Sequence, residues 1–79
     1  EEKIYPNPND GKGIILEFGT LRSGAALEIS NAQGGVIHRE MIAQGSKQHS
    51  ISVFQFPRGL LLIRLFNTDI NFTWKLLVP

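Results

Sequence analysis

Apolar and polar residues alternate in the last segment of the chain, residues 70–78. The apolar positions are Ile70, Phe72, Trp74, Leu76 and Val78, and mainly polar residues stand between them. Successive side chains of a β-strand point to opposite faces, so this pattern predicts a strand with one buried face. We therefore interpret Trp74 as a core residue.

The preceding segment, residues 60–67, carries Arg64 within an apolar run, and a short turn separates it from the last segment. Directly paired residues of a hairpin face the same side, and a shift of one residue exchanges the two faces. A register that paired Arg64 with Phe72 would bury a charge without a partner, which is costly. We therefore predict that Arg64 points outward, beside Thr73 or its neighbours. The predicted inward set is Leu61, Ile63 and Leu65 with Phe72, Trp74 and Leu76.

This register leaves apolar side chains on the outer face of the predicted hairpin: Leu60, Leu62, Phe66 and Leu77. An antiparallel sheet normally presents polar residues to water. One interpretation is that a loop or another strand covers these side chains, because small domains avoid large exposed apolar patches. The other is a docking surface for another protein. On that hypothesis the recognition face consists of Leu60, Leu62, Arg64, Lys75 and Leu77.

Clusters of Gly, Pro, Asn and Asp interrupt the rest of the chain at short intervals. Short apolar segments between such clusters, with no window long enough for a convincing helix, are typical of an all-β sandwich or barrel. We expect strands at residues 3–5, 13–18, 26–30, 35–42, 49–53, 60–67 and 70–78. The predicted fold class is all-β and antiparallel, with about seven strands.

The length and the net charge of the chain argue against several classes of function. The chain has 79 residues, no cysteine and a net charge of +1. A chain of this size forms one domain, here residues 1–79, and buries only about 60% of its unfolded surface. Its basic residues are interleaved with acidic ones, which argues against nucleic-acid binding. Its longest apolar run is interrupted by Arg64 and is too short to span a membrane.

The candidate chemical groups do not form a catalytic or metal-binding motif. His38 and His49 belong to different predicted strands and have no metal-ligand spacing, so each is interpreted as a partly exposed strand residue. Ser50 is adjacent to His49 in one strand, so the two side chains point to opposite faces. Glu28 and Glu40 can meet across strands, but a carboxylate pair alone carries no specificity. We predict no enzyme activity, no metal and no cofactor.

Four segments, in order, resemble the C-terminal sorting domains of type IX secretion in Bacteroidetes. Ile4-Tyr5-Pro6-Asn7-Pro8-Asn9-Asp10-Gly11 resembles their YPNP opening. The stretch from Leu27 to Ile37 is similar to their strand, N-x-x-G turn and following strand. Ile51-Ser52-Val53 followed by Phe56-Pro57-Arg58-Gly59 resembles the start of their penultimate strand, and Thr73-Trp74-Lys75-Leu76-Leu77-Val78 resembles their last strand. The chain departs from the family pattern at Ser52, Leu61 and Trp74.

The resemblance implies an immunoglobulin-like β-sandwich at the C-terminal end of a longer secreted protein. Its partners would be the outer-membrane translocon and sorting proteins of the type IX system, with a cargo domain attached on its N-terminal side. Such a domain passes through the periplasm and sends its cargo to the cell surface or outside, where the domain is removed or the cargo is anchored. By position in the motifs, Pro6, Asn7, Pro8, Gly34 and Gly59 would shape turns.

The last strand and the class of function each allow more than one interpretation. The last strand ends close to residue 79 and offers an edge for strand addition by a partner, or by a second copy in a weak homodimer. The competing functions are an adhesive or carbohydrate-binding sandwich module, for which Trp74 is the candidate sugar-stacking residue, and an inert spacer after a catalytic domain. The module would need exposed aromatic side chains.

Overall fold

The computed structural model describes residues 2–5 and 13–79 of the chain. Within these residues it contains seven strands. They are β1 (Lys3–Tyr5), β2 (Gly13–Glu17), β3 (Ala25–Ser30), β4 (Val36–Ile42), β5 (Gln48–Ser52), β6 (Gly59–Phe66) and β7 (Asn71–Val78). The strands agree with the predicted segments apart from one or two residues at their ends.

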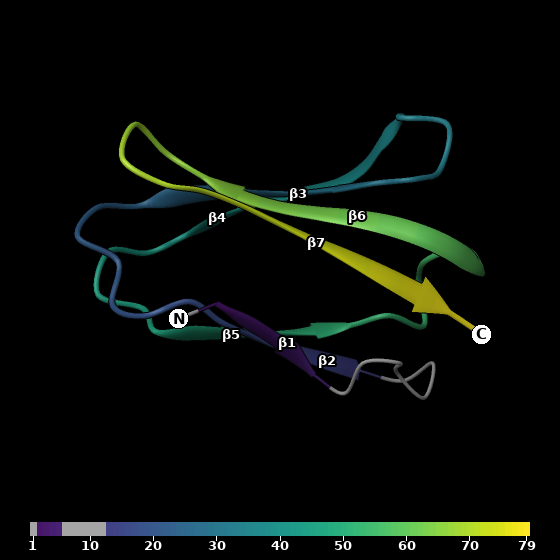
Figure 1. Cartoon of the computed structure of the whole chain (residues 1–79), viewed down its shortest axis with the longest axis horizontal. Helices are drawn as coiled ribbons and strands as arrows, with labels where there is room; N and C mark the ends of the chain where they lie inside the picture. The colour runs from purple at the N-terminus through teal and green to yellow at the C-terminus, as the bar shows by residue number, and fades with distance from the viewer. Residues whose placement is uncertain (1, 6–12) are drawn as a thin grey trace.

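The strands form two antiparallel sheets packed face to face (Figure 1). Sheet A has the order β1-β2-β5, and sheet B has the order β4-β3-β6-β7. The chain crosses from one sheet to the other in the connections β2–β3, β4–β5 and β5–β6. Three connections therefore link the two layers. This architecture is the immunoglobulin-like β-sandwich that the sequence predicts.

The core lies between the inner faces of the two sheets. Sheet A contributes Ile14, Leu16 and Ile51, while sheet B contributes Ala25, Leu27, Ile29, Ile42, Leu61, Ile63, Leu65, Trp74, Leu76 and Val78. Phe18, Leu21 and Val53, from the connections, complete it. The core residues that belong to strands occupy alternate positions, as the period of two predicts.

The hairpin of β6 and β7 has the register expected from the sequence. Leu61, Ile63 and Leu65 pair with Leu76, Trp74 and Phe72, and Arg64 pairs with Thr73 on the outer face. Trp74 is only 8% exposed, as its place in the alternating pattern predicts. The cost of burying Arg64 therefore accounts for the register of the whole hairpin.

Asn67 closes the turn between these two strands. Its side-chain oxygen accepts hydrogen bonds from the backbone N–H groups of Asp69 and Ile70, at 2.7 and 2.9 Å. Its amide nitrogen lies 3.3 Å from the carbonyl oxygen of Gly24 and 3.4 Å from that of Ser23, to which it donates. One side chain thus fixes the turn and joins it to the connection between β2 and β3.

Candidate functional site

The outer face of sheet B carries side chains in rows that run across its strands. The register places Met41, Ala26, Phe66 and Asn71 in a first row, and Arg39, Glu28, Arg64 and Thr73 in a second. Val36, Ser30, Leu62 and Lys75 form a third row, and Leu60 with Leu77 forms a fourth. A charged row therefore lies beside a more apolar area near the ends of β6 and β7.

The charged second row is held by local contacts. Glu28 and Arg39 form an ion pair at 2.5 Å between Oε2 and a guanidinium nitrogen. Arg64 donates a hydrogen bond from Nε to the side-chain oxygen of Asn71 at 2.9 Å, and its guanidinium lies 3.9 Å above the ring centre of Phe66. Arg64 therefore covers part of Phe66, which is half-buried.

The apolar area beyond this row is exposed to solvent. Leu60 and Leu77 pair directly and are 42% and 57% exposed. Leu62 is half-buried, and Lys75 lies opposite it on β7. On this face Leu60 and Leu77 are therefore exposed, whereas Leu62 and Phe66 are half-buried.

The structure brings the five predicted recognition residues together on two adjacent strands. Leu60 pairs with Leu77, Leu62 pairs with Lys75, and Arg64 stands one row further along β6. We call these five residues the β6–β7 patch.

Sequence reasoning missed Val36, which extends the third row onto β4 and is 55% exposed. The register between β3 and β4 shifts next to Ser30, so alternation alone does not assign Val36 to a face.

The four outer strands of the two sheets differ in how well their edges are protected. β1 has three residues, and β4 carries the register shift and the inward-facing polar side chains of His38 and Glu40. β5 is linked to β4 through His49. β7 has eight residues, and β6 is its ladder partner among the described strands. Short length, irregular register and inward-facing polar groups discourage strand addition at β1 and β4.

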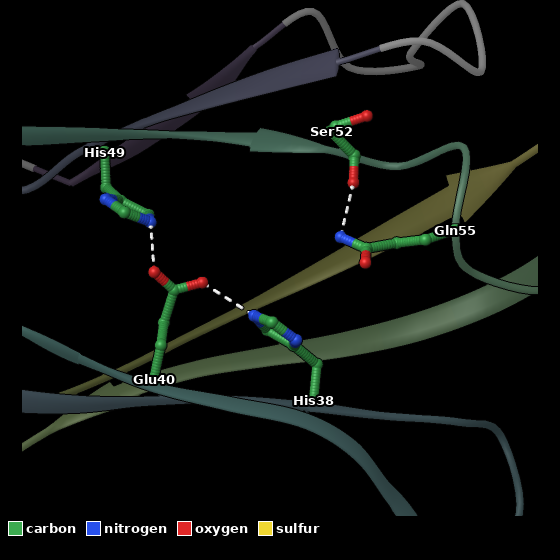
Figure 2. A network of polar contacts seen from close by, with 5 residues as sticks. All are labelled: His38, Glu40, His49, Ser52 and Gln55. Carbon is green, nitrogen blue, oxygen red and sulfur yellow. Dashed lines mark hydrogen bonds and ion pairs between the residues drawn. The ribbon is translucent and has the colours of Figure 1, made fainter.

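A polar cluster of three side chains joins the two sheets at the edges formed by β4 and β5 (Figure 2). Glu40 on β4 contacts His38 of the same strand through Oε2, at 2.6 Å from Nε2. It contacts His49 on β5 through Oε1, at 2.8 Å from Nε2. Sequence reasoning treated the two histidines separately and did not find this cluster, because its link is a contact between sheets.

The environment of Glu40 affects its ionisation. Burial raises the pKa of this carboxyl, but hydrogen bonds and positive charge from His38 and His49 outweigh that effect, so its pKa lies below the ordinary value. Glu40 therefore favours the ionised form, in which its two oxygens accept one hydrogen bond from each imidazole.

The suggestion that Glu28 and Glu40 meet is wrong. Glu28 lies on the outer face of sheet B opposite Arg39, whereas Glu40 pairs with the buried Leu27 and faces sheet A. They stand on neighbouring strands but on opposite faces, so their carboxylates do not form an acid pair.

The structure describes two of the five turn residues that the family motifs indicate, Gly34 and Gly59. Gly34 and Gly59 have φ angles of +90° and +109°, a region that favours glycine. Asn31 organises the turn at Gly34, because its side-chain oxygen accepts from the backbone N–H groups of Gln33 and Gly35 at 3.1 and 2.9 Å. Pro6, Asn7 and Pro8 lie outside the described residues.

A cavity of about 430 Å³ lies at the end of the sandwich near the β6–β7 turn. Its lining consists of Phe18, Thr20, Leu21, Arg22, Asn67, Asp69, Ile70 and Phe72. None of the five residues of the β6–β7 patch lines it, so this cavity and the exposed face are separate features.

Within residues 2–5 and 13–79, no group of three or more His, Cys, Asp or Glu side chains is arranged to hold a metal ion. In the same residues there is no helix long and apolar enough to cross a membrane.

The family model described as "Secretion system C-terminal sorting domain" matches residues 3–79. A comparison with curated proteins finds no match. The family match covers all four segments on which the sequence resemblance rests, from the opening turn to the last strand.

Proposed function

The chain belongs to the secretion system C-terminal sorting domains, and on this premise we propose that the β6–β7 patch is the surface by which the type IX machinery recognises it. A domain of this family is a C-terminal sorting signal that sends an attached cargo across the outer membrane, to the cell surface or outside. Our proposal adds the recognition surface, the translocon and sorting proteins as its partners, and passage through the periplasm.

The choice of this surface rests on one observation. Leu60 and Leu77 are paired, exposed to solvent and next to the cation of Lys75. Exposed apolar area flanked by polar groups is typical of protein interaction sites. Neither leucine is needed for the core, because both point away from it. In our proposal, the type IX machinery contacts both leucines on this exposed side.

We propose that residues 1–79 act by recognition and not by catalysis, as one sorting domain that follows a cargo domain. After transport, removal of the domain or anchoring of the cargo would follow. The carbohydrate-binding alternative is not favoured, since Trp74 is 8% exposed and packs edge to face against Phe72, with ring centres 6.1 Å apart. A buried indole does not offer a stacking surface to a sugar.

The test of the surface uses a periplasm-targeted fluorescent reporter fused to residues 1–79, in a bacterium with a working type IX system. Leu60→Gln with Leu77→Gln should keep the domain folded and reduce export. Met41→Gln is the matched control, because Met41 is an exposed apolar residue on the same face, 72% exposed, but in the row at the far side of the charged one. Normal export of the folded double variant would exclude the patch and leave the sorting function intact.

A further inference from the structure

The connection between β5 and β6, residues 53–58, holds one aromatic side chain in solvent. Phe54 is 74% exposed, which makes it the most exposed large apolar side chain of the described residues. Val53 before it is buried, and Phe56 after it packs against the core and edge to face against His38. Residues on both sides of Phe54 therefore attach this connection to the sandwich, while its own ring faces water.

Hydrogen bonds fix the backbone that carries Phe54. The backbone N–H of Phe56 donates to the carbonyl oxygen of Val53 at 3.1 Å, which closes the turn. The side-chain amide of Gln55 donates to the carbonyl oxygen of Ser52 at 3.2 Å, as Figure 2 shows. A ring on a turn that is already ordered loses less conformational entropy on binding than a ring on a free loop.

This turn lies at the end of the sandwich where β6 begins and β7 ends (Figure 1). There the first residue of β6 pairs with Val78, and Leu60 pairs with Leu77. The five most exposed large apolar side chains of the described residues are Val36, Met41, Phe54, Leu60 and Leu77. All except Met41 lie toward this end, since Met41 belongs to the first row, next to the β6–β7 turn. The apolar surface of the β6–β7 patch therefore continues toward Phe54.

The charged side chains at this end are cations. Arg58 is exposed in the same connection as Phe54, and Lys75 is exposed on β7. The described acidic side chains lie in the middle of the sheets or toward the opposite end: Glu2, Glu17, Glu28, Glu40 and Asp69. An apolar surface bordered by cations is complementary to an apolar pocket bordered by carboxylates.

We propose that Phe54 is the anchor of the recognition surface, and that its ring enters an apolar pocket of a type IX protein whose border carries carboxylates. This inference rests on the proposed recognition function and adds the chemistry of the partner. The pocket accepts a phenyl ring, and its carboxylates face Arg58 and Lys75. Aromatic side chains are enriched among the few interface residues that supply most of the binding energy. A lipid surface is less favoured, since one ring and two cations give only weak, reversible membrane binding.

The experiment uses the reporter fused to residues 1–79 in a bacterium with a working type IX system. Phe54→Gln should stay folded, with an unchanged midpoint of urea unfolding, because the ring is exposed. Its export should fall roughly 10-fold or more, the loss of affinity expected when a contact loses a buried phenyl ring. Phe54→Leu, which keeps an apolar side chain, should retain part of the export. Met41→Gln is the matched control and should be exported normally, because Met41 is 72% exposed but lies toward the other end.

A reversal of charge tests the acidic border of the pocket. Arg58→Glu should reduce export, because it places a carboxylate opposite carboxylates. Lys47→Glu makes the same change of charge in the connection between β4 and β5, where the carbonyl oxygen of Lys47 accepts from the backbone N–H of Phe18. This exposed position is at the opposite end of the sandwich, so Lys47→Glu should be exported normally.

The outcomes separate this inference from the function on which it rests. Normal export of folded Phe54→Gln, with retention of the Leu60→Gln and Leu77→Gln double variant, would overturn the anchor and leave the sorting function and the β6–β7 patch intact. Retention of the unsubstituted fusion would instead overturn the proposed function. Flotation of the purified chain with vesicles of phosphatidylethanolamine and phosphatidylglycerol, lost in Phe54→Gln, would overturn the protein pocket in favour of a lipid surface.

Discussion

Leu60 and Leu77 lie directly opposite each other on β6 and β7, and their side chains point into solvent while those of their neighbours Leu61 and Leu76 fill the core. The same hairpin therefore presents apolar residues on both faces. The inner set is required for folding, since it occupies the interface of the two sheets. The outer set points away from that interface, and we propose that it contacts a partner.

The two faces of the hairpin should respond differently to substitution. Leu76→Ala should lower the free energy of unfolding by about 2–5 kcal/mol, because it leaves a cavity in the core. Leu77→Gln should change it by about 0.5 kcal/mol or less, as is usual at exposed positions. Urea unfolding of both variants measures the difference. Equal losses of stability would mean that Leu77 has a structural role.

The turn held by Asn67 should depend on both ends of its amide. Asn67→Ala removes the acceptor for two backbone N–H groups and the donor to the neighbouring connection, and should cost about 1–3 kcal/mol. Asn67→Asp keeps the acceptor alone, so its cost should be smaller. Thermal unfolding of the two variants provides the comparison. If Asn67→Ala did not change the unfolding temperature, these hydrogen bonds would not be what holds the turn.

Backbone conformation, and not space, should limit substitution at Gly34. A Cβ atom there would meet no other atom within 4 Å, but the φ angle of +90° is unfavourable for any L side chain. Gly34→Ala should therefore cost about 1–2 kcal/mol. The control is Gly13→Ala, where φ is not positive and the added Cβ would lie 3.5 Å from the nearest atom, an ordinary contact. If the two substitutions cost the same in urea unfolding, the φ angle is not the cause.

At acidic pH, the free energy of unfolding should depend on the ionisation of Glu40. Its pKa is lowered in the folded chain, so the ionised carboxylate adds stability that is fully present above its ordinary pKa of 4.5. That stability is lost as the pH falls through the lowered folded-state pKa. Glu40→Gln should therefore lose less stability than the wild type in this interval. Parallel acid unfolding curves for the two chains would contradict the lowered pKa.

The parts of the fold set by local pattern could be predicted from the sequence. Alternation identified the buried set of β7, and the cost of burying Arg64 selected one register for the hairpin. The same argument placed the β6–β7 patch on one face, because the side-chain period within a strand is fixed. The exposure of Leu60 and Leu77 was left open, since it depends on what lies above the sheet and not on the strands themselves.

Features that arise between distant segments could not be predicted in the same way. The polar cluster of His38, Glu40 and His49 joins residues of two different sheets, and sequence spacing does not show that His49 reaches Glu40. Val36 was missed because the register shift beside Ser30 breaks the alternation. The separation of Glu28 from Glu40 follows from the register of β3 and β4, which pairs Glu28 with Arg39 and Glu40 with Leu27. Residues 36–42 carry apolar side chains at both odd and even positions, so alternation does not assign Glu40 to a face.

The chain is a folded sorting signal, and export of a periplasm-targeted fluorescent reporter tests this most directly. Fusion to residues 1–79 should send the reporter to the cell surface or the medium in cells with a working type IX translocon. The unfused reporter should stay inside, and the same fusion should stay inside cells that lack the translocon. A fusion that is folded, yet retained by translocon-competent cells, would contradict the claim, and so would export that does not require the translocon.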